Sequence, residues 1–134
     1  MNISIVIPVY NSSSIIENLT NDILSTTKEI SDVNKIQLIL VNDCSTDKSW
    51  EKISKLSSEH KEMIIGINLM RNYGQHNAIM AGLKLADGDY TILIDDDYQH
   101  PPKEIPKILS KIKEGYDVCY TNYKNNTYSK FKIF

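Results

Sequence analysis

The chain has 134 residues, enough for one domain, and 41% hydrophobic with 24% charged residues is ordinary for a soluble domain. A formal net charge of −2 argues against the basic surface that nucleic-acid binding needs. Two distant cysteines, Cys44 and Cys119, lack the paired spacing of a zinc site and predict free thiols. No signal peptide precedes the first strand and no apolar run reaches the roughly 18 residues of a membrane span, so we expect a cytoplasmic protein.

Strand and helix patterns alternate along the chain. Strands are predicted at 2–9, 36–41, 63–67, 90–94 and 117–123, and helices at 15–24, 50–58, 74–86 and 103–113. The serines at 12–14 are expected to supply the turn and the N-cap of the first helix. The alternation predicts an α/β domain: a Rossmann-like, doubly wound, mostly parallel sheet with helices on both faces. We expect the domain to span 1–123 and residues 124–134 to form a frayed tail.

The stretch 90–102, YTILIDDDYQHPP, joins an apolar strand to three consecutive carboxylates, Asp95, Asp96 and Asp97. Like charges at this density repel one another, so partial burial would raise their pKa values unless a cation were bound. Asp95 and Asp97 can present hard oxygen ligands to a divalent metal. The other interpretation is a solvated loop in which one aspartate caps the following helix.

A sheet whose order begins 3-2-1-4 has its switch point between the first strand and the strand at 90–94. The loops after the strands would then bring Tyr10, Asn11, Asp43 and Asp95 around one crevice at the carboxyl edge. Taken alone, each of these residues is equally well explained as a turn former.

The sequence lacks the two usual phosphate cradles, GxGxxG after the first strand and GxxxxGK[ST] anywhere. A diphosphate would therefore be held through a metal on Asp95 and Asp97, with Arg71, the chain's one arginine, adding charge-assisted hydrogen bonds. Tyr10 offers a ring for a base or sugar, and Asp43 can accept a base N–H. Together these residues predict a site for a nucleoside diphosphate.

Five segments also carry a resemblance to a known family: IVIPVYN, VNDCSTD, MRNYGQHNAIMAGL, ADGDY and IDDDYQHPP. In this order and at these separations they resemble the inverting family 2 glycosyltransferases of the GT-A fold. The likeness is greatest to the branch of dolichyl-phosphate mannose synthase and the undecaprenyl-phosphate glycosyltransferases. It runs from Ile5 to about Tyr120 and implies a truncated GT-A domain, the donor-binding part of a longer family pattern.

The resemblance implies a role for each matching residue. The residues expected to bind the donor substrate are Pro8, Tyr10, Asn11, Asp43, Arg71, Asn72, Gln75 and Asp96. The residues expected to hold a divalent metal, Mg²⁺ or Mn²⁺, are Asp95, Asp97 and Gln99, and the two aspartates are the expected catalytic residues. Asp96 stands where the family usually has a small residue, and it could point to solvent or to the sugar. Cys44 stands where the family usually has glycine, so it would have to tolerate a turn that glycine relaxes.

The resemblance further implies transfer of a sugar from a UDP- or GDP-linked donor to a polyprenyl phosphate, with inversion and metal assistance. Membrane association, at the inner face, would come through C-terminal segments outside this chain. The alternative is a non-catalytic nucleotide-sugar-binding module or an inactive fragment of such an enzyme. A nucleotidyltransferase would need a Gly-rich loop after the first strand, and a phosphatase would need its acids there, so both are disfavoured.

Overall fold

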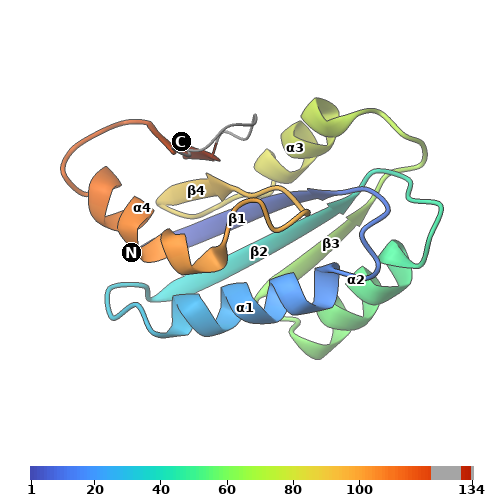
Figure 1. The fold of residues 1–134 in the computed structure, drawn as a ribbon, viewed down its shortest axis with the longest axis horizontal. Coiled ribbons are helices and arrows are strands. Elements are labelled where there is room, and N and C mark those ends of the chain that lie inside the picture. The colour runs from blue at the N-terminus through green and yellow to red at the C-terminus, as the bar shows by residue number, and fades with distance from the viewer. Residues whose placement is uncertain (122–130, 134) are drawn as a thin grey trace.

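The computed structural model describes residues 1–121 and 131–133 of the chain. In these residues the strands form one sheet of order β3-β2-β1-β4-β6-β5 (Figure 1). Its parallel part comprises β1 (Asn2–Val9), β2 (Lys35–Asn42), β3 (Ile64–Asn68) and β4 (Tyr90–Leu93). At the β4 edge, β6 (Phe131–Ile133) and β5 (Cys119–Thr121) continue the sheet in antiparallel pairing. The mostly parallel sheet is confirmed, and its order has the 3-2-1-4 run on which the expected switch point depends.

The register of the strands decides what meets at the carboxyl edge. Val9 of β1 pairs with Asn42 of β2, and Asn42 pairs with Asn68 of β3, so these three strands end level with one another. β4 ends earlier, because Leu93 pairs with Val6 and β1 continues past that pair. The residues after β4 therefore lie beside the last residues of β1. This places the acidic stretch next to the loop that follows β1.

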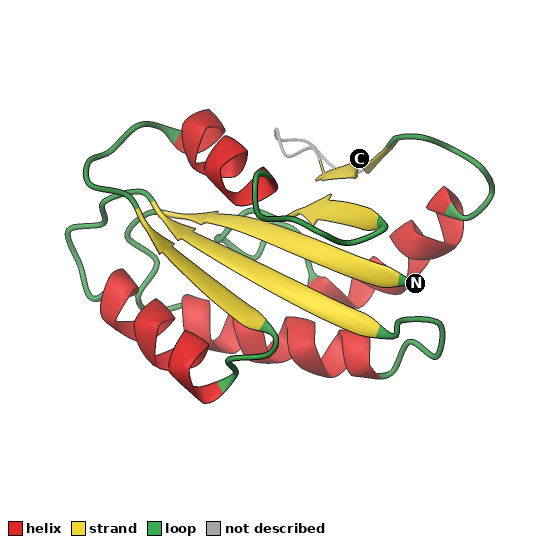
Figure 2. Cartoon of the chain, turned by 180° about the vertical axis from the view of Figure 1, so that it is seen from behind, coloured by secondary structure: helices red, strands yellow, loops and turns green. Residues whose placement is uncertain are grey.

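Helices cover both faces of the sheet (Figures 1 and 2). On one face lie α1 (Ile16–Lys28), α2 (Ser49–Glu59) and α4 (Ile105–Ile112), which follows the short 3₁₀ helix η1 (Pro102–Glu104). On the other face lies α3 (Gln75–Leu83). Successive strand residues point to opposite faces, so Ile3, Ile5 and Ile7 join the larger core while Val6 joins the smaller one under α3. This burial on both faces explains the continuous apolar runs of β1 and β2.

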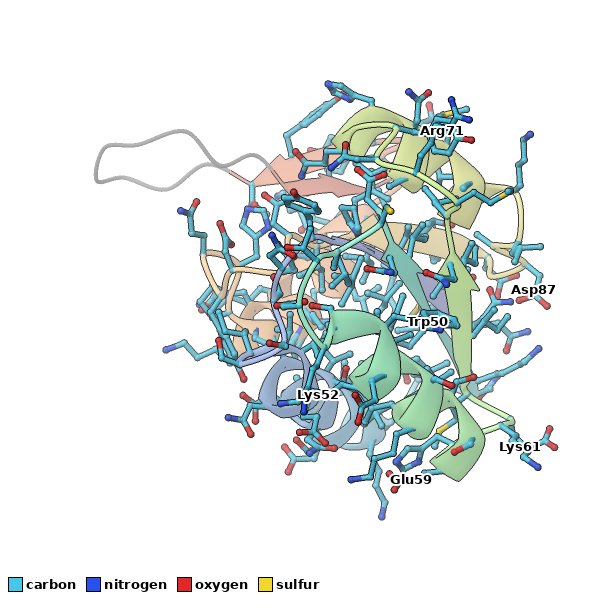
Figure 3. All side chains as sticks on the ribbon, turned by 90° about the vertical axis from the view of Figure 1, so that its right-hand side faces the viewer. Trp50, Lys52, Glu59, Lys61, Arg71 and Asp87 are labelled. Carbon is cyan, nitrogen blue, oxygen red and sulfur yellow. The ribbon has the colours of Figure 1, made fainter. Side chains whose placement is uncertain are left out.

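Two glycines allow helices to approach the sheet closely. A Cβ at Gly82 of α3 would lie 2.4 Å from Val6 Cγ1, closer than any side chain tolerates. A Cβ at Gly66 of β3 would lie 2.9 Å from Ile53 Cγ2 and 3.3 Å from Trp50 Cζ3 on α2; Figure 3 labels Trp50. The small residues in the sequence of α3 are thus a packing requirement of the face that it covers.

Three expectations need correction. The first helix begins at Ile16 with Ile15 at the N-cap position, so it has no side-chain cap, and the Ser12 hydroxyl donates to Asp96 instead. The strand expected at 117–123 spans Cys119–Thr121 and is antiparallel to β6; residues 122 and 123 lie outside the described residues. Of the tail expected to fray, 131–133 instead form β6 between β4 and β5, and the rest lies outside the described residues. No helix in the described part of the chain is long and apolar enough to cross a bilayer.

Candidate functional site

A cleft of about 510 Å³ opens at the carboxyl edge of the sheet, between the loops that follow β1, β2, β3 and β4. The residues that line it are Pro8, Val9, Tyr10, Asp43, Asn72, Gly74, Gln75, Asp95, Asp96, Asp97 and Gln99. Four loops far apart in the sequence contribute to it because parallel strands end at the same edge. The crevice predicted at the switch point between β1 and β4 is therefore present.

Most of the residues predicted to act in the site line this cleft, and two do not. Asn11 follows Tyr10 but turns away, and Arg71 is exposed, at the outer edge of the molecule beside α3 (Figure 3). Val9 and Gly74 line the cleft without having been predicted. Both lie inside segments that resemble the family, PVYN and RNYGQ. Their position next to predicted site residues is the sequence signal that could have identified them.

The acidic turn after β4 is held by hydrogen bonds within the turn and by one from α3. Asp95 Oδ1 accepts a hydrogen bond from Gln75 Nε2 at 2.8 Å, and the Asp95 backbone N–H donates to His100 Nδ1 at 3.3 Å. Asp97 Oδ1 accepts the N–H of Gln99 at 3.0 Å, which folds the chain back over Asp97. Asp95, Asp96, Asp97 and Gln99 of this turn all line the cleft.

Tyr98 anchors the same turn to α1. Its φ of 62° is left-handed, which a bulky residue adopts only when its surroundings hold it there. The hydroxyl donates to Asp22 Oδ2 on α1 at 2.6 Å. Burial, followed by this bond and the charge of Asp22, raises the pKa of Tyr98 to about 12. The phenol therefore stays protonated and keeps donating at any physiological pH.

The charges of the turn shift the pKa values of its members. Burial raises the pKa of the Asp95 carboxyl; Asp97 and Asp96 raise it further, while His100 and Gln75 partly offset the rise. His100 is 1% exposed, and its burial lowers the pKa of the imidazole despite the nearby carboxylates. Neutral His100 can accept the Asp95 N–H at Nδ1, whereas imidazolium cannot. The carboxylate of Asp95 is thus in a place that disfavours its charge unless a cation compensates it.

The donor set of this turn fits a hard divalent cation. Asp95, Asp97 and Gln99 all line the cleft and offer carboxylate and amide oxygens, the ligands of Mg²⁺ and Mn²⁺. Among the described residues there is no group of three or more His, Cys, Asp or Glu that could hold a metal ion by itself. Mg²⁺ is commonly bound through one or two carboxylates together with phosphate oxygens of its substrate. Two carboxylates and one amide are therefore compatible with a site that the phosphate oxygens of a substrate would complete.

Asp43, after β2, is engaged with the loop before α3. Its side chain is 4% exposed; Oδ1 accepts the N–H of Tyr73 at 2.8 Å and Oδ2 accepts the N–H of Gly74 at 3.0 Å. Such charge-assisted bonds are among the stronger ones in proteins. Asp43 therefore holds the segment that carries Asn72 and leads into Gln75. Each carboxylate oxygen has a second lone pair, so a further donor from a ligand can still be accepted.

Asn11 connects the loop after β1 to the loop after β2. Its Oδ1 accepts the N–H of Thr46 at 2.8 Å and the Thr46 hydroxyl at 3.2 Å, and its own φ is 51°. The side chain predicted to contact the nucleoside therefore faces a neighbouring loop. Cys44 has a φ of 56°, which confirms that this position takes the turn that glycine would relax. Cys44 and Cys119 are both free thiols, as predicted.

Asp96 is directed toward the loop after β1. Its Oδ2 accepts the backbone N–H of Tyr10 at 2.9 Å and the hydroxyl of Ser12. Ser12 is buried, and its own N–H donates to Ser49 Oγ at 2.9 Å. The sequence left open whether Asp96 points to solvent or to the sugar. Its Oδ2 points to neither and faces the loop after β1.

The 3-2-1-4 parallel part of the sheet and the acidic cleft at its carboxyl edge agree with the GT-A fold that the sequence resemblance implied. Two solved structures share the fold. Residues 1–349 of S. aureus TarS in complex with UDP-GlcNAc superpose with a TM-score of 0.67 at 21% identity, over 96% of this chain and 37% of that one. The mannosyltransferase PcManGT of Pyrobaculum calidifontis, in complex with GDP-Man and Mn²⁺, gives a TM-score of 0.64 at 18% identity, over 76% and 29%.

The sequence places the chain within this class. Residues 4–133 match the family described as Glycosyl transferase family 2, and the chain belongs to that family. The undecaprenyl-phosphate 4-deoxy-4-formamido-L-arabinose transferase of Proteus mirabilis is 41% identical over 130 residues, which are 97% of this chain. The chain spans 39% of the length of that relative. The predicted family and fold are confirmed.

Proposed function

We propose that the chain is the donor-binding part of a glycosyltransferase that transfers a sugar from a UDP- or GDP-linked donor to a polyprenyl phosphate, with inversion and metal assistance. The observation that carries the proposal is the cleft. It combines a carboxylate pair, Asp95 and Asp97, with the Tyr10 ring and the buried carboxylate Asp43 at one edge of the sheet. This is the combination of groups that a nucleoside diphosphate needs: a cation site, a stacking surface and an acceptor for base N–H groups.

On the diphosphate side, Asp95, Asp97 and Gln99 would hold a Mg²⁺ or Mn²⁺ ion. The ion would supply positive charge against the charge that develops on the leaving diphosphate. Gln75 orients the Asp95 carboxyl through its 2.8 Å hydrogen bond. Asn72 lines the same cleft from the loop that Asp43 holds. Arg71 would have to turn inward from its exposed position to reach the donor.

On the nucleoside side, Pro8 and Tyr10 form the wall of the cleft after β1, and the half-exposed Tyr10 ring is available to stack on a base or sugar. Asp43 has a double role in the proposal. It holds the loop of Tyr73 and Gly74, and its remaining lone pairs would accept a base N–H. Asn11 supports this wall indirectly through its bond to Thr46.

The acceptor proposed here is a polyprenyl phosphate, as the name of the Proteus mirabilis relative states for that protein. A phosphate acceptor is already ionised near neutral pH, so it can attack the anomeric carbon with little help from a general base. Displacement from the face opposite the leaving diphosphate inverts that carbon. Because a polyprenyl phosphate resides in a membrane, the proposed reaction takes place at a membrane surface, and we propose the cytoplasmic one.

The test is calorimetric titration of the chain with UDP, GDP and their sugars, with and without Mn²⁺ or Mg²⁺. Micromolar to millimolar binding that the metal strengthens is the expected result, and the preferred base identifies the donor class. No binding of any nucleotide under either condition would contradict the proposal. Transfer onto polyprenyl phosphate by the longer protein then separates an enzyme from a non-catalytic nucleotide-sugar-binding module.

A further inference from the structure

We infer that Asp96 is a positioning residue that ties the nucleoside wall of the cleft to its acidic turn, and that it binds neither the metal nor the donor. The inference rests on the proposed function, because it concerns how the two parts of the donor site are held in register. It assigns different roles to three consecutive aspartates. Asp95 and Asp97 serve the ligand, whereas Asp96 serves the loop after β1.

The contacts of Asp96 carry the inference. Both donors, the Tyr10 N–H at 2.9 Å and the Ser12 hydroxyl, reach the same oxygen, Oδ2. Both belong to the loop between β1 and α1, 86 and 84 residues away in sequence. Ser12 is in turn fixed by its N–H to Ser49 Oγ at the start of α2. A single carboxylate oxygen therefore joins the turn after β4 to a loop that is already tied to the second helix.

The position of this bond in the sheet explains why it is needed. The paired residues of β1 and β4 end at Val6 and Leu93, and Ile94 N adds one further bond to Val6 O at 3.1 Å. Past that point β1 and the segment after β4 are no longer paired, and each leads into a different loop. The hydrogen bond from the Tyr10 N–H to the side chain of Asp96 connects these two loops.

Charge explains why an aspartate suits the position. Its carboxylate accepts two hydrogen bonds at one oxygen, and bonds to an ionised acceptor are shorter and stronger than neutral ones. The two donors also partly compensate the charge of Asp96, which reduces its repulsion with the neighbouring carboxylates of Asp95 and Asp97. The Tyr10 ring is 48% exposed, so few side-chain contacts hold it. Its place over the cleft then depends on the backbone that Asp96 fixes.

The experiment compares the chain with its Asp96→Ala and Asp96→Asn variants, using UDP and GDP with and without Mn²⁺. Asparagine keeps an oxygen where both donors point, so the Asn variant should bind within about twofold of the wild type. Alanine removes both bonds, and affinity should fall about tenfold with or without the metal. If Asp96→Asn abolishes the effect of Mn²⁺, Asp96 is a metal ligand and the inference is overturned.

A double-mutant cycle with Tyr10→Ala tests whether Asp96 acts through Tyr10. If the role is positioning, Asp96→Ala should cost little more once the Tyr10 ring is absent, because the two changes remove the same interaction. Additive losses would mean an independent contact between Asp96 and the donor, which contradicts the inference. Should Asp96→Ala fail to fold, Ser12→Ala removes one of the two bonds and should give a smaller loss in the same cycle.

Amide hydrogen exchange gives a readout without any ligand. The Tyr10 N–H should exchange slowly in the wild type and in Asp96→Asn but faster in Asp96→Ala, while β1 amides such as that of Ile7 stay protected. Equal exchange of the Tyr10 amide in all three proteins would overturn the positioning role alone. If the wild type binds neither UDP nor GDP, the proposed function fails, while the exchange of the Tyr10 amide still tests the positioning role of Asp96.

Discussion

Two aspartates at the carboxyl edge of one sheet lie in opposite electrostatic surroundings. Asp43 after β2 is 4% exposed, and each of its oxygens accepts a backbone N–H. Asp95 after β4 has one hydrogen bond from Gln75 and shares its turn with two further carboxylates, and burial together with those charges raises its pKa. A carboxylate that the backbone satisfies holds loops in place. One that is left among like charges gains most from a cation.

Asp43→Ala should break the first of these arrangements and have the largest effect. It removes two charge-assisted hydrogen bonds and leaves the N–H groups of Tyr73 and Gly74 without their acceptor. We expect the free energy of unfolding, measured in urea, to fall by about 3 kcal/mol. Nucleotide affinity should fall with or without metal. Asp117→Ala, at an exposed aspartate, is the matched control. Unchanged stability and unchanged affinity for every nucleotide would return Asp43 to the role of a turn former.

Asp97→Asn should break the second arrangement and leave the fold intact. The amide can accept the Gln99 N–H as the carboxylate does, but it is a much poorer ligand for a hard cation. The gain in nucleotide affinity that Mn²⁺ gives the wild type should be lost, a change of roughly tenfold or more. Asp96→Asn is the control that should keep this gain. If Mn²⁺ strengthens binding equally in wild type and Asp97→Asn, Asp97 is not a ligand.

The pH dependence of stability sharpens the comparison. Since the pKa of Asp95 in the folded chain lies above its ordinary value of 3.8, its stabilising contribution is present at low pH and is lost as pH rises through the folded pKa. Without metal, Asp95→Asn should therefore match the wild type in acid and become relatively more stable toward neutral pH. Urea titrations at several pH values in EDTA measure this. A difference that does not vary with pH would contradict the assignment.

Asp47→Asn should change the pH dependence of stability in the opposite direction to Asp95→Asn. Burial alone would raise its pKa, but hydrogen bonds from Ser49 and Ser13 lower the pKa to about 2. Its contribution is present at neutral pH and is lost as pH falls from about 3.8 toward 2. Asp47→Asn should thus cost stability near pH 7 and nothing at the acid end. The same slope for Asp47→Asn and Asp95→Asn would contradict at least one of the two assignments.

Tyr98→Phe is expected to have the smallest effect. It removes the hydrogen bond to Asp22 but keeps the ring that packs against the core, so the free energy of unfolding should fall by about 1 kcal/mol or less. Nucleotide affinity should stay within about twofold of the wild type. Tyr116→Phe, at an exposed tyrosine, is the control. A loss of metal-dependent binding in Tyr98→Phe would mean that this anchor sets the geometry of the acidic turn.

Much of the site could be predicted because its members follow strands. Once the alternation of strands and helices implies a parallel sheet, residues that follow different strands must meet at one edge. That reasoning is enough to gather Tyr10, Asp43 and Asp95 in one cleft, although these residues are far apart in the sequence; it also named Asn11, which does not line the cleft. The likeness to the family adds Gln75 and Gln99, which also line it.

The sequence by itself determined which residues reach the edge of the sheet, and only the tertiary structure decided where their side chains point. Inside a strand, alternation dictates the direction of each side chain, but after the strand ends the direction depends on the turn and on the donors nearby. Asp96 turns to Tyr10 N, and Asn11 turns to Thr46, because loops from distant parts of the sequence present unpaired N–H groups there. Ser12, one of the three serines expected to supply the turn and the N-cap of α1, donates its hydroxyl to the distant Asp96 instead. No local pattern encodes such partners, since the bond exists only after the sheet has brought the loops together.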